Sequence, residues 1–247
     1  MKRCLFTLMS NNFFIAFKVY MKSFLDNNPW FSDEMVVLAE NLPPSTQRRM
    51  LEIYDRITFI PPKYGAYSGT NFNQTIPSLK STYYKLDAFS LLEYDRVIQL
   101  DMDMICQGDM KEVFDCDEPI GACRTYRNSH DALGKDINSG VFVLNKPVLN
   151  LETYVELINR TQKGQSMPDQ KIINQQFRHI MFHLPKKYNV EKRALHSRTF
   201  DLPIKEWINI HYVGKKPWHD RDDIPESEKR YVELEDIWWE WHDKYYG

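Results

Sequence analysis

The sequence predicts an α/β protein, built as a single domain around a mainly parallel sheet that is flanked by helices. Strand-like apolar segments alternate with helix-like segments from the N-terminus onward, and this alternation is typical of a parallel sheet. The chain has 247 residues, enough for one full core, and shows no linker or internal repeat. Hydrophobic residues make up 43 % of it, which excludes a disordered chain. We therefore expect one compact unit over residues 1–247.

The first half of the chain predicts three strands with helices between them. The first strand is Lys2–Leu8. A helix follows, because four apolar side chains recur on one helical face: Phe13, Phe17, Met21 and Phe24. The second strand is Glu34–Ala39 and the third is Arg56–Ile60. Between them, Ser45 is expected to cap a helix that runs to Tyr54.

A loop and a helix lead from there to the central strand. Residues 63–78 are rich in Gly, Asn and Ser, as loops are. Ser81 is expected to cap a helix that carries Lys85. The apolar run of Val97, Ile98 and Leu100 then indicates a buried strand.

The second half predicts further strands and helices. Two strands, Ile120–Cys123 and Val141–Asn145, come first, and the polar residues Asp136, Asn138 and Ser139 stand directly before the second of them. The remaining predicted elements are a helix over Leu151–Lys163, a helix with Asp169 and Gln170 in its first turn, a strand over Trp207–His211 and an aromatic helix over Leu234–Gly247. An Asp in a first turn suits the helix dipole and needs no function to explain it.

The central strand ends in Asp101-Met102-Asp103, at an edge where sheets of this class open into a crevice. Residues two apart in an extended chain point to one side, so both carboxylates can face one hard cation while Met102 packs the other way. An acidic turn without a metal is the competing interpretation, because Asp is ordinary at strand ends. A metal site here would need further ligands from elsewhere in the chain or from a bound phosphate.

Composition narrows the class of protein. The net charge of −2 argues against nucleic-acid binding, and no apolar run approaches the roughly 20 residues that a membrane span needs. Polar residues interrupt the apolar N-terminal stretch, so we interpret it as strand and turn and not as a signal peptide. The four cysteines lack zinc-type spacing and fit reduced thiols: Cys4, Cys106, Cys116 and Cys123. We expect a cytoplasmic protein without a transmembrane segment.

Five motifs occur in the order and approximate spacing of glycosyltransferase family 8: YDRVIQLDMD, KDINSGVFVLN, PDQKIIN, LPKKYNV and HYVGKKPW. The chain resembles this family, which includes glycogenin, galactinol synthases and bacterial lipopolysaccharide galactosyltransferases, over residues 2–218. The resemblance implies a GT-A fold, a nucleotide-sugar-binding half over residues 1–110 and an acceptor half over residues 111–247. It also implies transfer of a hexose, glucose or galactose, from a UDP-sugar with retention of configuration and with Mn²⁺ as cofactor.

By their match to these motifs, the metal ligands would be Asp101, Asp103 and His211. Two carboxylates and one imidazole suit Mn²⁺ better than Mg²⁺, the second candidate, and diphosphate oxygens would complete the shell. A lone histidine at a strand end is more often a core residue. The adjoining Gly-Lys-Pro-Trp run favours the ligand interpretation of His211.

The resemblance also implies a set of residues that bind the donor. This set is Thr7, Leu8, Ser10, Asn11, Phe14, Lys85, Asp101, Met102, Asp103, Asp136, Asn138, Ser139, Gly214 and Lys216. The uracil end would rest on the residues after the first strand, and Phe14 stands where the family often has a stacking tyrosine. Lys85 and Asp136 match positions that hydrogen-bond the donor sugar.

Three residues would act at the reacting bond. Asp169 and Gln170 match the pair that faces the sugar near its anomeric carbon, and Lys216 matches the lysine at the diphosphate. Gly214 and Lys216 are one residue closer together than in the family pattern, so Lys215 is the alternative. Retention can proceed through a covalent intermediate or through same-face attack within an ion pair. No unassigned carboxylate stands out as a nucleophile, which favours the ion pair, with Gln170 as the positioning residue.

Two other functions compete with transfer. One is a sugar-nucleotide-binding protein with little or no turnover, and the other is a glycoside hydrolase that uses two carboxylates. The acceptor of a transferase would be a carbohydrate, a glycolipid or a protein, selected by the loops over residues 124–135 and 191–200. We expect the aromatic tail to pack on the body of the protein or on a second subunit in a homodimer.

Overall fold

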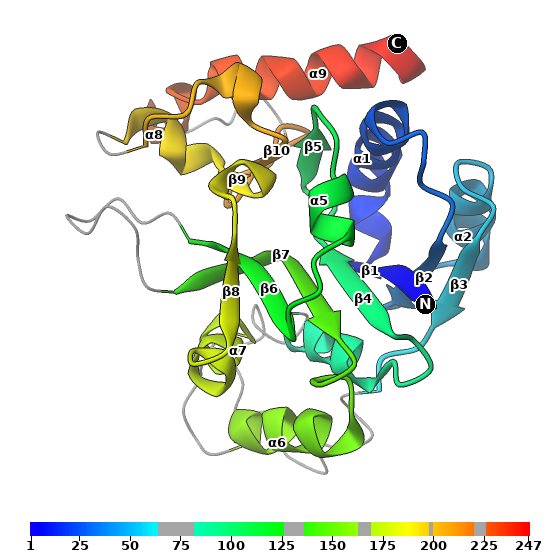
Figure 1. The fold of residues 1–247 in the computed structure, drawn as a ribbon. Coiled ribbons are helices and arrows are strands. Elements are labelled where there is room, and N and C mark those ends of the chain that lie inside the picture. The colour runs from blue at the N-terminus through cyan, green and yellow to red at the C-terminus, as the bar shows by residue number, and fades with distance from the viewer. Residues whose placement is uncertain (64–81, 126–135, 163–168, 198–199, 220–225) are drawn as a thin grey trace.

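A seven-stranded sheet with helices on both faces organises the molecule, as seen in a computed structural model (Figure 1). The structure describes residues 1–63, 82–125, 136–162, 169–197, 200–219 and 226–247. In spatial order, the strands are β3 (Ile57–Ile60), β2 (Glu34–Ala39), β1 (Arg3–Met9), β4 (Arg96–Leu100), β7 (Ile137–Asn145), β6 (Ile120–Arg124) and β8 (Met181–Leu184).

Strand β7 is the one strand of this described sheet that runs against the others. It pairs antiparallel with β4 and with β6. The other neighbouring pairs are parallel. All nine residues of β7 are buried, as expected for a strand with helices on both faces. The sheet is mixed and mainly parallel, which confirms the predicted fold class.

Helices form a separate layer on each face of the sheet. One layer contains α1 (Phe14–Asn27), α2 (Pro44–Leu51) and α5 (Lys111–Phe114). The opposite layer contains the 3-10 helix η3 (Tyr84–Ser90), α6 (Leu151–Gln162) and α7 (Asp169–Phe177). Successive residues of a strand point to opposite faces, so the neighbours Leu5 and Phe6 of β1 belong to different apolar cores. Figure 1 shows α1 and α5 on one side of the sheet and α6 and α7 on the other.

A second, three-stranded sheet connects the end of β4 to the C-terminal part of the chain. Its strands are β5 (Met104–Cys106), β10 (Asn209–His211) and β9 (Val190–Glu191), in the order β5-β10-β9. Helix α9 (Val232–Tyr246) buries Leu234 and Trp238 beside Val19 of α1 and Ile210 of β10. The aromatic tail therefore packs on the body of the protein (Figure 1). Short helices complete the described chain: η1 (Asn11–Phe13), η4 (Lys186–Tyr188), η5 (Lys192–His196), η6 (Ile204–Glu206) and α8 (Glu226–Lys229).

The boundaries of β7 and α2 differ from the prediction. Strand β7 begins at Ile137 and not at Val141, so Asn138 and Ser139 lie inside a strand and not before it. Polar residues suggest a loop, but here strand pairing holds them in the sheet. Helix α2 begins at Pro44 and has no side-chain cap. Ser45 was therefore wrongly expected to be the cap, since the proline supplies a suitable backbone angle at the first helical position.

Other predictions were incomplete. Strands β5 and β8 were not predicted, because three or four residues are too few for a periodic signal. Helix α2 ends at Leu51 and not at Tyr54, and β10 begins at Asn209. Ser81 lies outside the described residues, and Lys85 lies in η3. No helix in the described ranges is long and apolar enough to cross a bilayer.

Candidate metal and nucleotide site

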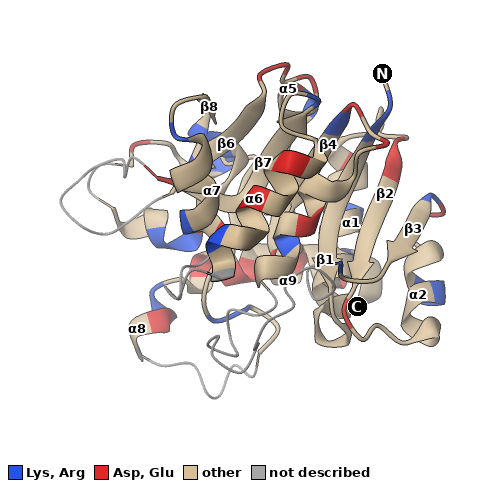
Figure 2. Cartoon of the chain, turned by 90° about the horizontal axis from the view of Figure 1, so that it is seen from below, with Lys and Arg blue, Asp and Glu red and all other residues tan. Residues whose placement is uncertain are grey.

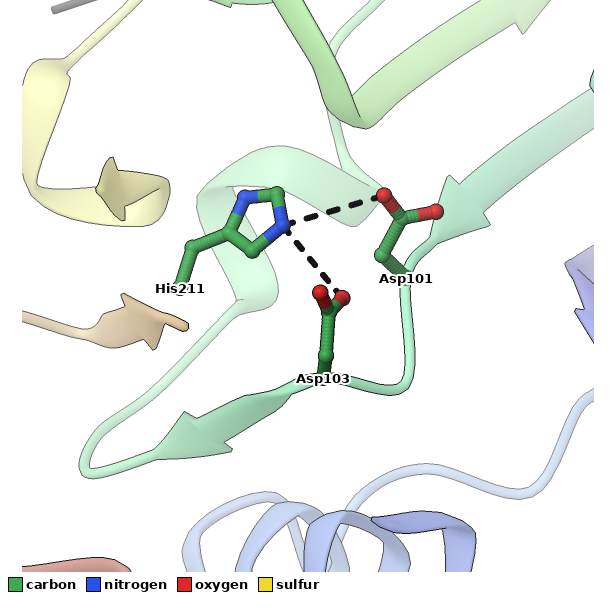
Figure 3. Close-up of side chains that lie close together, drawn as sticks. All are labelled: Asp101, Asp103 and His211. Atoms are coloured by element: carbon green, nitrogen blue, oxygen red, sulfur yellow. Dashed lines mark ion pairs between the residues drawn. The ribbon is translucent and has the colours of Figure 1, made fainter. Parts of the chain in front are cut away.

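Two strands bring three metal-ligating side chains together. Asp101 and Asp103 occupy the turn between β4 and β5, and His211 ends β10, where it pairs with Met104 of β5. One ligand atom from each of the three side chains lies within 4.8 Å of the others. Figure 3 shows the imidazole of His211 directed at both carboxylates. The small sheet therefore places a residue from the end of the chain beside two from its middle.

Two lysines flank the three ligating side chains. The His211 Nε2 atom lies 3.3 Å from Asp103 Oδ1 and 3.8 Å from Asp101 Oδ2. Lys85 Nζ donates to Asp101 Oδ2 at 2.7 Å, and Lys216 Nζ donates to Asp103 Oδ2. Each carboxylate thus faces one ammonium group and the imidazole.

Mutual electrostatics hold Asp103 and Lys85 in their charged forms. Burial alone would raise the pKa of Asp103, but the charges of His211 and Lys216 and their hydrogen bonds lower it well below its usual range. Burial alone would lower the pKa of Lys85, but the charges of Asp101, Asp169 and Asp103 raise it above its usual value. Asp103 therefore stays ionised, the form in which a carboxylate binds a metal ion.

The orientation of His211 is set by a pair of asparagines. His211 Nδ1 lies 2.9 Å from Asn189 Oδ1. Asn189 Nδ2 in turn donates to Asn138 Oδ1 at 2.9 Å, so Asn189 Oδ1 is the acceptor for a proton on His211 Nδ1. When the imidazole is neutral, this arrangement leaves the lone pair of Nε2 facing the carboxylates, which is the tautomer that binds a metal.

Gly140 of β7 provides the space for this imidazole. A Cβ atom at position 140 would lie 2.5 Å from His211 Cε1, 2.7 Å from His211 Nδ1 and 2.8 Å from Asn138 Oδ1. Any side chain there would displace the ring or Asn138. The backbone of Gly140 also accepts a hydrogen bond from the Asp101 amide at 2.9 Å, so one residue supports two of the ligands.

The donor set fits a divalent cation such as Mn²⁺. It combines two hard carboxylate oxygens with one neutral imidazole nitrogen, and all three side chains are fixed by further hydrogen bonds. Gln99 Nε2, for example, donates to Asp101 Oδ1 at 2.8 Å. Three protein ligands leave room for oxygens of a bound phosphate in an octahedral shell.

A cavity of about 290 Å³ lies beside these residues. The residues that line it are Leu8, Ser10, Asn12, Phe13, Glu40, Thr82, Lys85, Asp101, Met102 and Asp103. Six of these are predicted donor-binding residues, whereas Asn12, Phe13, Glu40 and Thr82 were missed. The cavity follows the ends of β1 and β4, the edge at which the sequence predicts ligand binding.

Three residues of the predicted uracil-binding group have other contacts. The Thr7 hydroxyl donates to the Leu100 carbonyl at 2.8 Å, and Asn11 Oδ1 accepts from Thr46 at 2.7 Å. Phe14 is buried on α1 under the Arg49 guanidinium, 4.4 Å from the ring centroid. Phe13 lines the cavity instead. Residue pattern alone does not decide which of two adjacent phenylalanines at a helix start faces the ligand side.

The other predicted residues lie around the same region. Asp169 is buried at the start of α7 and acts electrostatically on Lys85, while Gln170 follows it on the helix. Asn138 and Ser139 are buried in β7, and Asp136, just before that strand, lines a second cavity.

The loop after β10 brings Lys216 to the site. Gly214 has a φ of +81°, a conformation that favours glycine, and no heavy atom lies within 4 Å of where its Cβ would be. Lys216 Nζ also donates to the Tyr212 carbonyl at 2.9 Å, and the buried Lys192 Nζ donates to the Lys215 carbonyl at 2.8 Å. The shorter Gly-Lys spacing therefore still places the ammonium of Lys216 on Asp103.

Sequence reasoning missed Asn189 and Gly140. Both lie inside motifs already singled out, LPKKYNV and KDINSGVFVLN. Their importance comes from contact with the imidazole of His211, which is distant in sequence, so no local pattern reports it.

The comparisons with known proteins agree with this geometry. The family model for glycosyl transferase family 8 matches residues 4–222. Glycogenin-1 from Homo sapiens is 29 % identical over 203 residues, which cover 75 % of this chain and 53 % of that protein. The glycosyltransferase GlyE from Streptococcus pneumoniae is 24 % identical over 191 residues, covering 72 % of this chain and 45 % of GlyE. The chain spans about half the length of these curated relatives.

Solved structures show the same fold. The apo form of GlyE superposes with a TM-score of 0.72 at 21 % identity, covering 98 % of this chain and 60 % of that one. The galactosyltransferase LgtC, in complex with donor and acceptor sugar analogues, superposes with a TM-score of 0.66 at 20 % identity and covers 95 % of both chains. The fold is thus the GT-A fold of these glycosyltransferases, and the chain belongs to glycosyl transferase family 8.

Proposed function

We propose that the protein is a retaining hexosyltransferase that moves glucose or galactose from a UDP-sugar to an acceptor with the help of Mn²⁺. One observation carries this proposal: Asp101, Asp103 and His211 converge between two lysines at the mouth of a cavity of about 290 Å³. This combination suits a diphosphate, because a cation held by the carboxylates and the two ammonium groups beside them both attract phosphate oxygens.

In this proposal the cavity binds the nucleoside end of the donor. Phe13 offers an aromatic face for the uracil, and an edge contact with Trp218 at 5.8 Å between ring centroids supports its position. Phe13 takes the role expected for its neighbour Phe14, whose ring is already covered by Arg49. Residues 1–110 then bind the nucleotide, and residues 111–247 supply His211, Lys216 and the acceptor side.

Lys216 and Lys85 have different roles. As the bond from the anomeric carbon to the diphosphate breaks, its electrons pass to a diphosphate oxygen, and the ammonium of Lys216 stabilises that charge. A bound Mn²⁺ would supply a second positive charge there. Lys85 holds Asp101 and contributes a hydrogen-bond donor toward the sugar. The acceptor oxygen attacks from the face that the diphosphate leaves, and its proton goes to the departing diphosphate.

Gln170 is the positioning residue for this same-face route. Its neutral amide follows the buried Asp169 at the start of α7. The first turn of a helix favours negative charge, which suits a carboxylate at the position of Asp169. A neutral amide does not form a stable covalent bond to the sugar, which supports an ion pair over a glycosyl-enzyme intermediate.

A donor assay tests the proposal. UDP-glucose and UDP-galactose are incubated with the protein, with and without Mn²⁺ and with and without an array of carbohydrate, glycolipid and protein acceptors. We expect release of UDP only with Mn²⁺, and faster release with a suitable acceptor. Binding of the UDP-sugar without any release in every combination would support the alternative, a binding protein without turnover. Release that needs no Mn²⁺ would contradict the metal role.

A further inference from the structure

A second cavity, of about 540 Å³, lies between α7 and the strands β6 and β8. The residues that line it are Arg124, Asp136, Lys171, Asn174, Gln175, Arg178, Met181 and His183. None of the basic residues among these belongs to the donor site. This second cavity is therefore separate from the cavity beside the three metal-ligating side chains, and it has a different set of charged residues.

The charge of this cavity is positive. Arg124 ends β6, Lys171 lies on α7, and Arg178 directly follows that helix. Against these three cations, the described lining residues include one carboxylate, Asp136. Figure 2 shows blue, basic ribbon in the region of α7 and β6. Within the described residues, none of the three cations makes a hydrogen bond or an ion pair.

His183 adds a polar atom that has no partner. Its Nδ1 atom is buried and has no hydrogen-bond partner among the described residues. Burial lowers the pKa of His183, and the charge of Arg124 lowers it further. A buried polar atom that is left unsatisfied costs free energy, and in the tautomer with the proton on Nδ1 an incoming acceptor group would satisfy it.

The cavity adjoins the first turn of α7. Asn174, one of its lining residues, donates from Nδ2 to the Gln170 carbonyl at 2.8 Å and accepts at Oδ1 from the Ile137 amide at 2.9 Å. Asp136, the residue before Ile137, is a predicted contact of the donor sugar. A ligand in this cavity would therefore lie next to the residues proposed to hold the sugar during transfer.

We propose that this cavity binds an anionic group, a phosphate or a carboxylate, that is part of the acceptor. Guanidinium groups bind both kinds of oxyanion through paired hydrogen bonds, and Arg124 and Arg178 supply two of them. The proposal rests on the transferase function proposed above. It narrows the acceptor class to molecules with a negative charge near the hydroxyl that receives the sugar.

Calorimetric titration tests the site with defined probes. The protein is first saturated with Mn²⁺ and UDP, so that the diphosphate site is filled, and is then titrated with glucose 6-phosphate, with glucuronate and with glucose. We expect one or both anions to bind and glucose to bind at least tenfold more weakly. Glucose 6-phosphate alone would identify a phosphate site, and glucuronate alone a carboxylate site.

Matched variants assign the binding to this cavity. Arg178→Gln should weaken anion binding about tenfold or more, which is the loss expected for one charge-assisted hydrogen bond. Arg48→Gln, at an exposed arginine of α2, makes the same charge change elsewhere and should have no effect. Release of UDP from the donor without acceptor should be the same in Arg178→Gln as in the wild type.

The outcomes separate this proposal from the transferase function. The anionic site would be overturned, with UDP binding intact, by either of two results. One is equal binding of glucose and the anions, and the other is anion binding that is unchanged in Arg178→Gln. Failure to bind UDP with Mn²⁺ would instead contradict the transferase function and with it the acceptor role, even if the anions still bound through Arg178.

Discussion

At the residue scale, Lys216 illustrates how one ammonium group serves two anionic partners. It faces Asp103 in the structure and, in the proposed reaction, the diphosphate. Negative charge develops on the diphosphate as the bond breaks, so the ammonium group stabilises the transition state more than the ground state. This contact should therefore matter mainly for turnover.

Lys216→Ala should therefore reduce kcat by roughly a hundredfold, the usual effect of losing one electrostatic donor at a developing negative charge. The affinity for UDP-sugar should change much less. Lys215→Ala is the matched control and should leave kcat nearly unchanged. Residue 215 accepts a hydrogen bond from Lys192 through its backbone carbonyl, and the variant keeps that carbonyl. If Lys215→Ala lost turnover and Lys216→Ala kept it, Lys215 would be the lysine that binds the diphosphate.

Gly140 gives a second prediction at this scale. Gly140→Ala should weaken Mn²⁺ binding by about 10- to 100-fold, the usual effect of disturbing a residue that orients a metal ligand, because the new Cβ displaces the imidazole of His211. Titration with Mn²⁺ in the presence of UDP measures this affinity. Gly108→Ala is the control, since a Cβ there meets only the mobile end of the Ile208 side chain. Equal Mn²⁺ affinity in both variants would mean that His211 is not a ligand.

At the scale of elements, side-chain hydrogen bonds connect β2 to β3 and to the segment before β4. Glu34 of β2 accepts from Thr58 of β3 at 2.5 Å and from Tyr94, before β4, at 2.6 Å. Burial alone would raise the pKa of Glu34, but these hydrogen bonds outweigh it and lower the pKa. The ionised carboxylate is therefore the form that ties the three segments together.

A carboxyl group with a lowered pKa in the folded state stabilises the fold above its unfolded pKa of about 4.3 and loses that effect as the pH falls through the folded value. Glu34→Gln should thus be less stable than the wild type at pH 7, and the difference should shrink below about pH 4. Urea unfolding at several pH values measures it. Glu240→Gln, at an exposed site on α9, should show no such trend. A difference that is constant with pH would contradict the ionised role of Glu34.

Element length decided what the sequence could predict. Strands β1, β2 and β4 carry runs of apolar residues and were predicted from them. Strand β5 is three residues long and depends on pairing with β10, about a hundred residues later. Local patterns do not record such pairing. The start of β7 was missed for a related reason, because the polar Asn138 and Ser139 are buried there by their neighbours in the fold.

In the candidate site too, some residues could be predicted from local sequence and others could not. The paired aspartates stand out in the sequence because they end an apolar strand, and His211 was found through its motif. Asn189 and Phe13 were not found, since one acts through contact with His211 and the other through the direction of its side chain. Chemistry that depends on residue type is visible in a sequence, whereas chemistry that depends on orientation requires the fold.

At the scale of the whole molecule, two sheets and two distant segments of the chain meet at one point. Strand β4 brings the aspartates, β10 brings His211, and the loop after β10 brings Lys216. Helix α9 packs behind β10 and α1 through Leu234 and Trp238, so the C-terminal helix supports the strand that presents the histidine. Metal binding should therefore depend on the integrity of the whole fold.

The most direct test of this account is UDP binding by calorimetry in the presence of Mn²⁺ and then of EDTA, for the wild type and for Asp103→Asn. The amide keeps the shape of the side chain and removes its charge. We expect tight binding only for the wild type with Mn²⁺, and weak binding for Asp103→Asn under both conditions, with its circular dichroism spectrum unchanged. Undiminished Mn²⁺-dependent UDP binding in Asp103→Asn would contradict the metal site.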